Sequence, residues 1–362
     1  MERNTNTLYA VRFIAALVVV LFHYSPPGVR TDLTPVIKNG NEAVNIFFFI
    51  SGFVLTVSNA RFLGNAQSVF PKKEFYIKRI ARIYPLYLLA ILILLFFHYG
   101  IQAIDGPSVK YKILFEMLGV QQWLYVGSFN YPGWSISCEI MFYLLFPFIA
   151  QRMRRNSNVF TWFVWFYYLV TVAATYLLYP WYKADLPFIT RRLVDAIYMN
   201  PLLLISVFMF GMLAGECFNK KSIPFFNRSR NSLIAAIVAG VVILLAKYYA
   251  PHSSALLKGG LLAPVYFVFI MAITSFKTKH TKFITSRPII FLGDISYAMY
   301  IMQYPLYVFY IRYIQPVATP TALVNYIVAL ICFASLTHLF VEKPLRKVIT
   351  SLYRPRPELA ER

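Results

Sequence analysis

An arginine and a histidine share one predicted membrane helix, at a spacing that could serve chemistry. The first apolar segment, about residues 6–26, holds Arg12 and His23 with ten residues between them. At about 100° per residue, both side chains return to one helical face, about 16 Å apart along the axis. Ionisable groups inside a membrane are costly and usually mark a functional site. The pair would suit a long anionic ligand that lies along the helix.

His23 is the candidate general base. It comes just before Tyr24, Ser25 and the Pro26-Pro27 pair, which predicts a place at the outer end of the helix. A neutral imidazole with an ordinary pKa of about 6.5 can accept a proton from a hydroxyl near pH 7. The alternative is an interfacial histidine that only forms a hydrogen bond.

Glu139 is a carboxylate inside another apolar segment, about residues 134–151. It lies about 7 Å below the outer end of that helix, a depth close to that of His23. A buried carboxylate needs a partner. His23 is one possibility, and Glu139 would then orient the imidazole in catalysis. The other possibility is a neighbouring Arg, Tyr or Ser, since Ser135 and Tyr143 share the same helical face.

A pair of arginines at the entry to the third segment predicts phosphate binding. Arg79 and Arg82 lie three residues apart and are followed by Tyr84. Guanidinium groups bind phosphate with two parallel hydrogen bonds. With Arg12 they would form one binding site for a phosphate-rich molecule. The alternative is ordinary anchoring of a basic loop to anionic lipid.

Polar residues recur on one face of the ninth segment, where Ser296, Tyr300 and Gln303 follow helical spacing. A polar stripe in a membrane helix should face the bundle interior. His338 and Glu342 lie four residues apart and are better explained by a helix-end contact than by a metal site. The sequence contains no recognised metal-binding motif, and we expect no metal.

These residues lie in a chain of 362 residues that is 59% hydrophobic and only 14% charged. This composition is typical of a polytopic membrane protein. Apolar runs of about 20 residues predict an all-α fold with about ten transmembrane helices. The predicted segments are roughly 6–26, 42–60, 83–100, 134–151, 159–180, 200–217, 231–250, 257–276, 289–314 and 322–341.

The net charge of +21 is explained by topology and not by nucleic-acid binding. About two thirds of the Lys and Arg residues fall in alternate loops, which places those loops and both termini in the cytoplasm. We expect one transmembrane domain over residues 1–345 and a short basic cytoplasmic tail over 346–362. Residues 101–133 do not fit a simple crossing, and a helix near 112–125 would be interfacial or re-entrant.

Six groups of residues resemble motifs of the membrane-bound acyltransferase 3 family, in the family's order. They begin with Arg12 and His23 and end with Glu342-Lys343-Pro344-Leu345. The members between them are Asn45 to Phe53 with Ser51, Arg79 to Tyr87, Trp134-Ser135 to Pro147 with Glu139 and Tyr143, and Gly293 to Tyr300 with Ser296. The chain departs from the family at Gln303, where a histidine is expected.

The resemblance implies an O-acyltransferase, most simply an O-acetyltransferase, in the bacterial inner membrane. Its co-substrate would be cytoplasmic acetyl-CoA or another acyl-CoA, with no bound cofactor. Its acceptor would be a hydroxyl of a surface or lipid-linked glycan, such as O-antigen lipopolysaccharide, exopolysaccharide or capsule. His23 and Glu139 would be catalytic, and His23 either deprotonates the acceptor or is itself acylated first.

Two other classes of function fit parts of the same pattern. Ten helices with a buried arginine would also suit a transporter or flippase for a glycan or anion, although no repeated halves are visible. A binding or sensor protein that keeps the fold without turnover would suit the departure at Gln303. Consumption of labelled acyl-CoA in the presence of acceptor separates the enzyme from both.

The predicted topology can be tested by labelling single cysteines with a membrane-impermeant reagent. A cysteine at Lys38 should react on intact cells, because the loop of residues 25–41 is expected outside. A cysteine at Lys72 should react only after permeabilisation. The opposite pattern would invert the predicted orientation.

Overall fold

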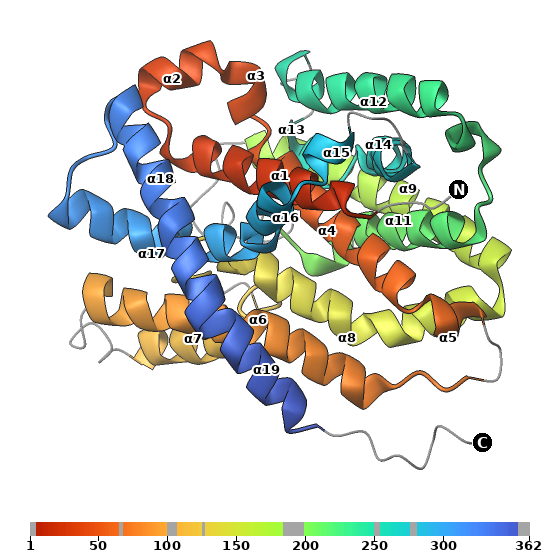
Figure 1. The fold of residues 1–362 in the computed structure, drawn as a ribbon, viewed down its shortest axis with the longest axis horizontal. Coiled ribbons are helices and arrows are strands. Elements are labelled where there is room, and N and C mark those ends of the chain that lie inside the picture. Colours follow the sequence, from red (N-terminus) through yellow and green to blue (C-terminus); the bar gives the residue numbers. More distant parts are fainter. Residues whose placement is uncertain are drawn as a thin grey trace.

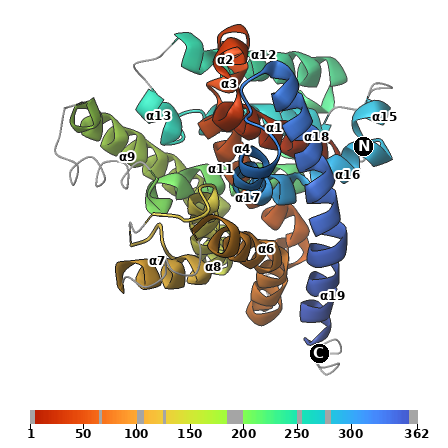
Figure 2. The same cartoon turned by 90° about the vertical axis from the view of Figure 1, so that its left-hand side faces the viewer.

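The computed structural model describes residues 5–64, 68–99, 107–124, 127–183, 199–249, 254–275 and 281–353. Every regular element in these ranges is a helix, which confirms the predicted all-α class. Most long helices run side by side, and α18 with α19 crosses one side of the bundle (Figures 1 and 2).

Eight helices of the described ranges are long and apolar enough to cross a membrane. Each falls on a predicted segment, and α18 runs through a π-helical turn, His338–Glu342, into α19, Lys343–Ser351. Residues 346–351 of the expected tail are therefore helical. The eight helices are α1 Thr7–Tyr24, α4 Gly40–Ser58, α6 Lys72–Leu94, α8 Gly133–Arg155, α9 Ser157–Lys183, α11 Pro201–Lys220, α12 Ser229–Tyr249 and α18 Pro320–Thr337.

The two other predicted crossings are short or interrupted. The segment 257–276 is divided into α13, Ser254–Lys258, and the 13-residue α14, Ala263–Ser275, with Gly260 between them at a φ of +90°. The segment 289–314 is divided at Ile295 into α16, Arg287–Asp294, and α17, Ser296–Tyr313.

Two contacts mark the junction between α16 and α17. A Cβ on Gly293 would lie 2.5 Å from the Cα of Tyr9, so α16 touches the backbone at the start of α1. The Ser296 hydroxyl donates to the Gly293 carbonyl at 2.7 Å, across the junction.

The remaining short elements connect the long helices. They are α2 Pro27–Asp32, α3 Thr34–Ile37, α5 Ala60–Gly64, the π-helical turn η1 Leu95–Tyr99, α7 Pro107–Leu118, the 3-10 turn η3 Pro224–Asn227 and α15 Thr281–Ile284.

Helix α7 and the turn after it lie against the bundle. The Tyr84 hydroxyl donates to the Leu118 carbonyl at 2.9 Å, and the Tyr87 hydroxyl donates to the Glu116 carbonyl at 2.7 Å. The indole of Trp123 donates to the Ser137 carbonyl at 2.8 Å. The helix expected near 112–125 is thus shorter, and its end is attached to both α6 and α8.

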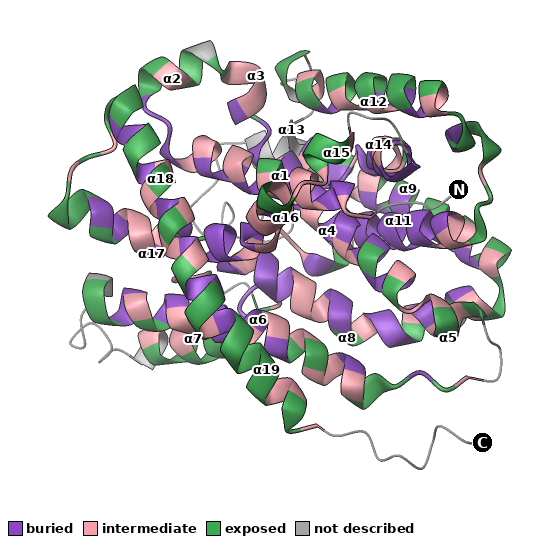
Figure 3. Cartoon of the chain, viewed as in Figure 1, coloured by how far each residue is buried: buried purple, intermediate pink, exposed green. Residues whose placement is uncertain are grey.

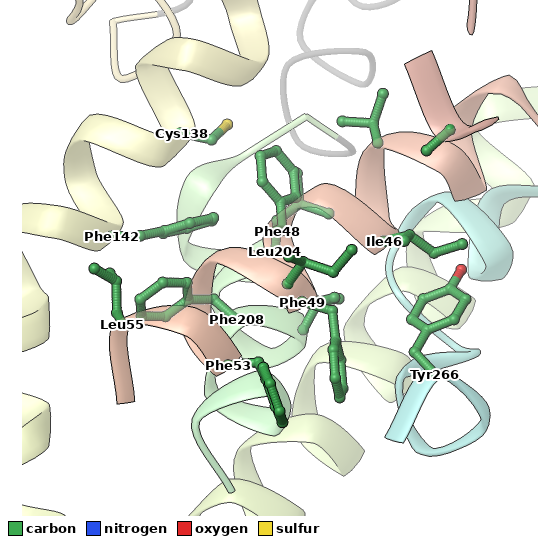
Figure 4. Packing of buried hydrophobic residues seen from close by; sticks show 14 of the residues in the cluster. Ile46, Phe48, Phe49, Phe53, Leu55, Cys138, Phe142, Leu204, Phe208 and Tyr266 are labelled. Atoms are coloured by element: carbon green, nitrogen blue, oxygen red, sulfur yellow. The ribbon is translucent and has the colours of Figure 1, made fainter. Parts of the chain in front are cut away.

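The tightest contact in the bundle joins α4 and α11, the two most buried long helices (Figure 3). A Cβ on Gly52 would lie 2.1 Å from the Phe208 carbonyl oxygen, and one on Gly211 would lie 2.0 Å from that of Phe49. Small residues let membrane helices approach backbone to backbone. Aromatic rings fill the space beside this contact, where Phe142 lies 5.2 Å from Phe208 (Figure 4).

We expect Gly211→Ala to destabilise the protein, because the added methyl group meets a backbone carbonyl that cannot rotate away. Overpacking of this kind costs about 1–3 kcal/mol. Thermal melting in detergent would measure the loss. Gly240→Ala is the matched control, since its Cβ would lie 3.6 Å from Phe269, an ordinary contact. Equal melting of both variants would contradict the packing argument.

Candidate active site

A cavity of about 140 Å³ lies between α1, α4, α6, α8 and α17. It brings together residues that are far apart in the sequence, and most of the predicted polar residues line it. Its polar lining consists of Arg12, Ser51, Arg79, Arg82, Ser135, Glu139, Tyr143, Tyr297 and Tyr300, and the rest of its wall is apolar. The predicted arginine set and part of the polar stripe therefore face one interior space.

Two of the three arginines in the cavity are available to a ligand. Among the described residues, no carboxylate forms an ion pair with Arg12 or Arg79. The Nε of Arg79 is buried without a hydrogen-bond partner, and its guanidinium lies 5.8 Å from the Tyr143 ring. Half-buried cations in an apolar bundle are stabilised when an anion joins them. The cavity is therefore suited to a negatively charged group.

Arg82 is held in place by the C-terminal end of the bundle. Its guanidinium donates to one carboxylate oxygen of Glu342, and the other oxygen lies 2.8 Å from Nδ1 of His338. The Tyr297 ring lies 5.6 Å from the guanidinium. The contact expected between His338 and Glu342 exists, but its extension to Arg82 could not be predicted from helical spacing.

Glu139 accepts its hydrogen bonds inside the cavity. The Ser51 hydroxyl donates to Oε1 of Glu139 at 3.0 Å, and the Tyr143 hydroxyl donates to the same oxygen. Of the two possibilities for Glu139, the structure therefore shows the neighbouring Tyr and Ser side chains and not a hydrogen bond with His23, although the predicted depths of Glu139 and His23 are similar. Glu139 faces α4, whereas His23 at the end of α1 faces α17.

The partner of His23 is Gln303. Its side-chain oxygen lies 3.3 Å from Nδ1 of His23. The Gln303 amide nitrogen donates to the Tyr300 carbonyl at 2.7 Å, and a carbonyl can only accept. The amide oxygen must therefore face His23, so Nδ1 carries the proton and Nε2 keeps its lone pair. The residue that departs from the family pattern orients the candidate base.

One layer of side chains separates the cavity from His23. The Ser135 and Tyr300 hydroxyls are 2.7 Å apart at the end of the cavity, and Gln303 follows Tyr300 by one helical turn. Along α8, the cavity wall extends from Ser135 to Tyr143, about 12 Å at 1.5 Å per residue. The cavity thus begins among the arginines and ends next to the residues that hold His23.

Besides His23 and Gln303, three predicted residues lie outside the cavity lining. The Trp134 ring packs edge-on against Phe48, with centroids 6.2 Å apart. The Ser296 hydroxyl donates to the Gly293 carbonyl. Tyr84 donates to the carbonyl of Leu118, so the expectation that it binds the donor is not supported. No group of three or more His, Cys, Asp or Glu side chains in the described ranges could hold a metal ion.

The sequence of the chain matches a known protein family. The sequence model of the acyltransferase 3 family, described as an acyltransferase domain, matches residues 6–339. The chain belongs to this family. The motifs that surround the cavity and His23 lie within the matched region, with only Glu342 just beyond it.

Curated relatives support the same chemistry. The chain is 22% identical to the O-acetyltransferase OatA of Staphylococcus aureus over 94% of its own length and 57% of the relative. It is also 22% identical to the peptidoglycan O-acetyltransferase OatA of Listeria monocytogenes over 96% of its own length and 58% of the relative. It is 34% identical to the acyltransferase MdmB of Streptomyces mycarofaciens over 41% of its length and 40% of the relative. No solved structure matches significantly.

The chain therefore spans less than two thirds of the length of these relatives. The chain is thus a member of the acyltransferase 3 family with eight candidate membrane-spanning helices in its described residues, and it is similar to peptidoglycan O-acetyltransferases over part of their length. The transporter and sensor alternatives have no comparable support.

We expect Gln303→Leu to lower acyl transfer by about tenfold, because a neutral hydrogen bond contributes up to about 1.5 kcal/mol. Without the amide oxygen, the proton is free to move to Nε2 of His23. Gln303→Glu should retain more activity than Gln303→Leu, since its carboxylate also accepts from Nδ1. Turnover of labelled acyl donor at equal protein levels measures both. Equal activity in the wild type and Gln303→Leu would remove this orienting role.

Proposed function

We propose that the protein transfers an acetyl group from cytoplasmic acetyl-CoA to a hydroxyl of a bacterial cell-surface glycan. The observation that carries this proposal is the cavity between the helices. Three arginines line it, and Tyr300 in its wall lies one turn of α17 before Gln303, which contacts His23. CoA is an elongated molecule with a phosphate-rich end and a thioester at the other end. Its phosphate groups match the positive charge that the arginines give to the cavity.

The arginines would hold the phosphates of the donor. Arg12 and Arg79 have no carboxylate partner among the described residues and can each offer a bidentate contact. Arg82 is oriented by Glu342 and offers its remaining N–H groups. Glu139, with Ser51 and Tyr143, lines the same space as a positioning residue. This role replaces its expected part in a His23 pair.

The acetyl group would have to pass the Ser135–Tyr300 layer to reach His23. Nε2 of His23 then takes the proton of the acceptor hydroxyl as the oxygen attacks the thioester carbonyl. The C–S bond breaks, and the imidazolium returns the proton to the CoA thiolate. Gln303 keeps the imidazole in the tautomer that this step requires. The acceptor becomes an O-acetyl ester, and free CoA is released.

The location follows from the same argument. The arginines of the cavity lie toward the end of the bundle that holds the basic loops, which the positive-inside rule places in the cytoplasm. His23 lies toward the other end of α1 and would face the outer side of the inner membrane. The OatA relatives are named for O-acetylation, and one of them for peptidoglycan, which supports a surface glycan as acceptor.

The proposal is tested with labelled acetyl-CoA and the unacetylated surface glycan in membranes that contain equal amounts of each variant. His23→Ala should lose about 10²–10⁴-fold in rate, the usual cost of removing a general base. Arg12→Lys should weaken use of acetyl-CoA but not of the acceptor, because an ammonium cannot form the bidentate contact. Arg152→Lys on the exposed end of α8 is the matched control. Transfer by His23→Ala within threefold of wild type would overturn the mechanism.

A further inference from the structure

An exposed tyrosine lies directly beside the candidate base. The rings of Tyr131 and His23 are 4.9 Å apart and nearly perpendicular. The Tyr131 side chain is 51% exposed, whereas the other tyrosine in ring contact with His23, Tyr24, is 9% exposed. Tyr131 is therefore an exposed aromatic ring in direct contact with His23.

The backbone on both sides of Tyr131 is fixed to the rest of the protein. The carboxylate of Glu116, on α7, accepts the N–H groups of Phe129 and Asn130. The side-chain amide of Asn130 donates to the Ile301 carbonyl on α17 at 3.0 Å. After Tyr131, the Pro132 carbonyl accepts from the Tyr300 hydroxyl at 3.4 Å. The ring is thus presented by a rigid segment attached to the helix that carries Gln303.

Fixing this segment requires the burial of a carboxylate. Glu116 has no exposed surface, and burial raises its pKa to about 7 despite the two backbone N–H donors, which act in the opposite direction. A Cβ on Gly133 would lie 2.9 Å from Oε1 of Glu116, so the first residue of α8 has to be small. Burial of the Glu116 carboxylate costs free energy, and an exposed loop does not need such an anchor. We infer that the segment it fixes has a role of its own.

We propose that Tyr131 is the acceptor-binding residue, whose ring stacks against a pyranose ring of the glycan and directs one sugar hydroxyl toward His23. This inference rests on the proposed function. The face of an aromatic ring carries partial negative charge, and the C–H groups on one side of a pyranose carry partial positive charge. A flat, rigid and exposed ring next to the base therefore selects a cyclic sugar over an open-chain alcohol. Glu116 is a positioning residue that acts through the segment of residues 129–132.

The test uses the purified full chain in lipid nanodiscs with two acceptors. One is surface glycan extracted from cells that lack this protein, and the other is glycerol, which has hydroxyls but no ring. Tyr131→Ala should raise the apparent KM for the glycan about tenfold, the upper range for one aromatic contact. It should leave the KM for acetyl-CoA and the rate with glycerol within twofold. Tyr131→Trp should retain use of the glycan.

Two controls separate stacking from a structural effect. Tyr249→Ala removes another exposed tyrosine, at the end of α12, and should change neither the KM for the glycan nor the rate with glycerol. Glu116→Gln should raise the KM for the glycan in the same direction as Tyr131→Ala without changing that for acetyl-CoA. An equal loss with glycan and glycerol in Tyr131→Ala, or an unchanged KM for the glycan, would overturn the assignment.

Glycan binding measured without acetyl-CoA keeps this inference distinct from the proposed function. Binding to the Tyr131→Ala protein should be about tenfold weaker than to the wild type. If the wild type binds glycan in this Tyr131-dependent way but transfers nothing, the proposed function fails and the binding site stands. If transfer occurs but binding does not depend on Tyr131, only the site assignment fails.

Discussion

The ion pair between Arg82 and Glu342 is the constraint on which the rest of the site depends. A guanidinium placed inside an apolar bundle needs an anionic partner, and Glu342 supplies it from the end of the last long helix. This contact joins α6 to the turn between α18 and α19, about 260 residues later in the chain. Among the described residues, Arg12 and Arg79 form no such ion pair. Because only one of the three arginines is neutralised, the cavity can accept an anion.

Much of the site could be predicted from the sequence because helical periodicity determines both depth and face. Arg12 and Glu139 are predicted inside the membrane and Arg79 and Arg82 at the entry to the third segment, and all four line one cavity. Periodicity does not reveal which way a helix is rotated relative to its neighbours. For this reason the sequence leaves the partner of Glu139 open between His23 and a neighbouring polar side chain, and the structure shows Ser51 and Tyr143.

The contacts that could not be predicted are those between distant parts of the chain. His23 and Gln303 are separated by 280 positions, and nothing in the local sequence of either residue indicates the other. Tyr131 lies in a segment without periodicity, so its place beside His23 depends on anchoring by Glu116 and Asn130. Segment 289–314 also makes a remote contact near the point where it divides, between Gly293 and Tyr9. Local composition predicts the helices, whereas it does not predict the tertiary contacts between them.

The glycine contact between α4 and α11 has a consequence for what the cavity can hold. Because the two backbones already touch at Gly52 and Gly211, α4 cannot move back toward α11 to enlarge the cavity. The side of the cavity formed by Phe47, Phe48 and Ser51 is therefore a fixed wall. A bulkier molecule in the cavity would have to gain its room by displacement of α6 or α17, which disturbs the Arg82 pair or the Gln303 contact. The packing of two glycines outside the cavity thus limits the size of the molecule that the cavity can hold.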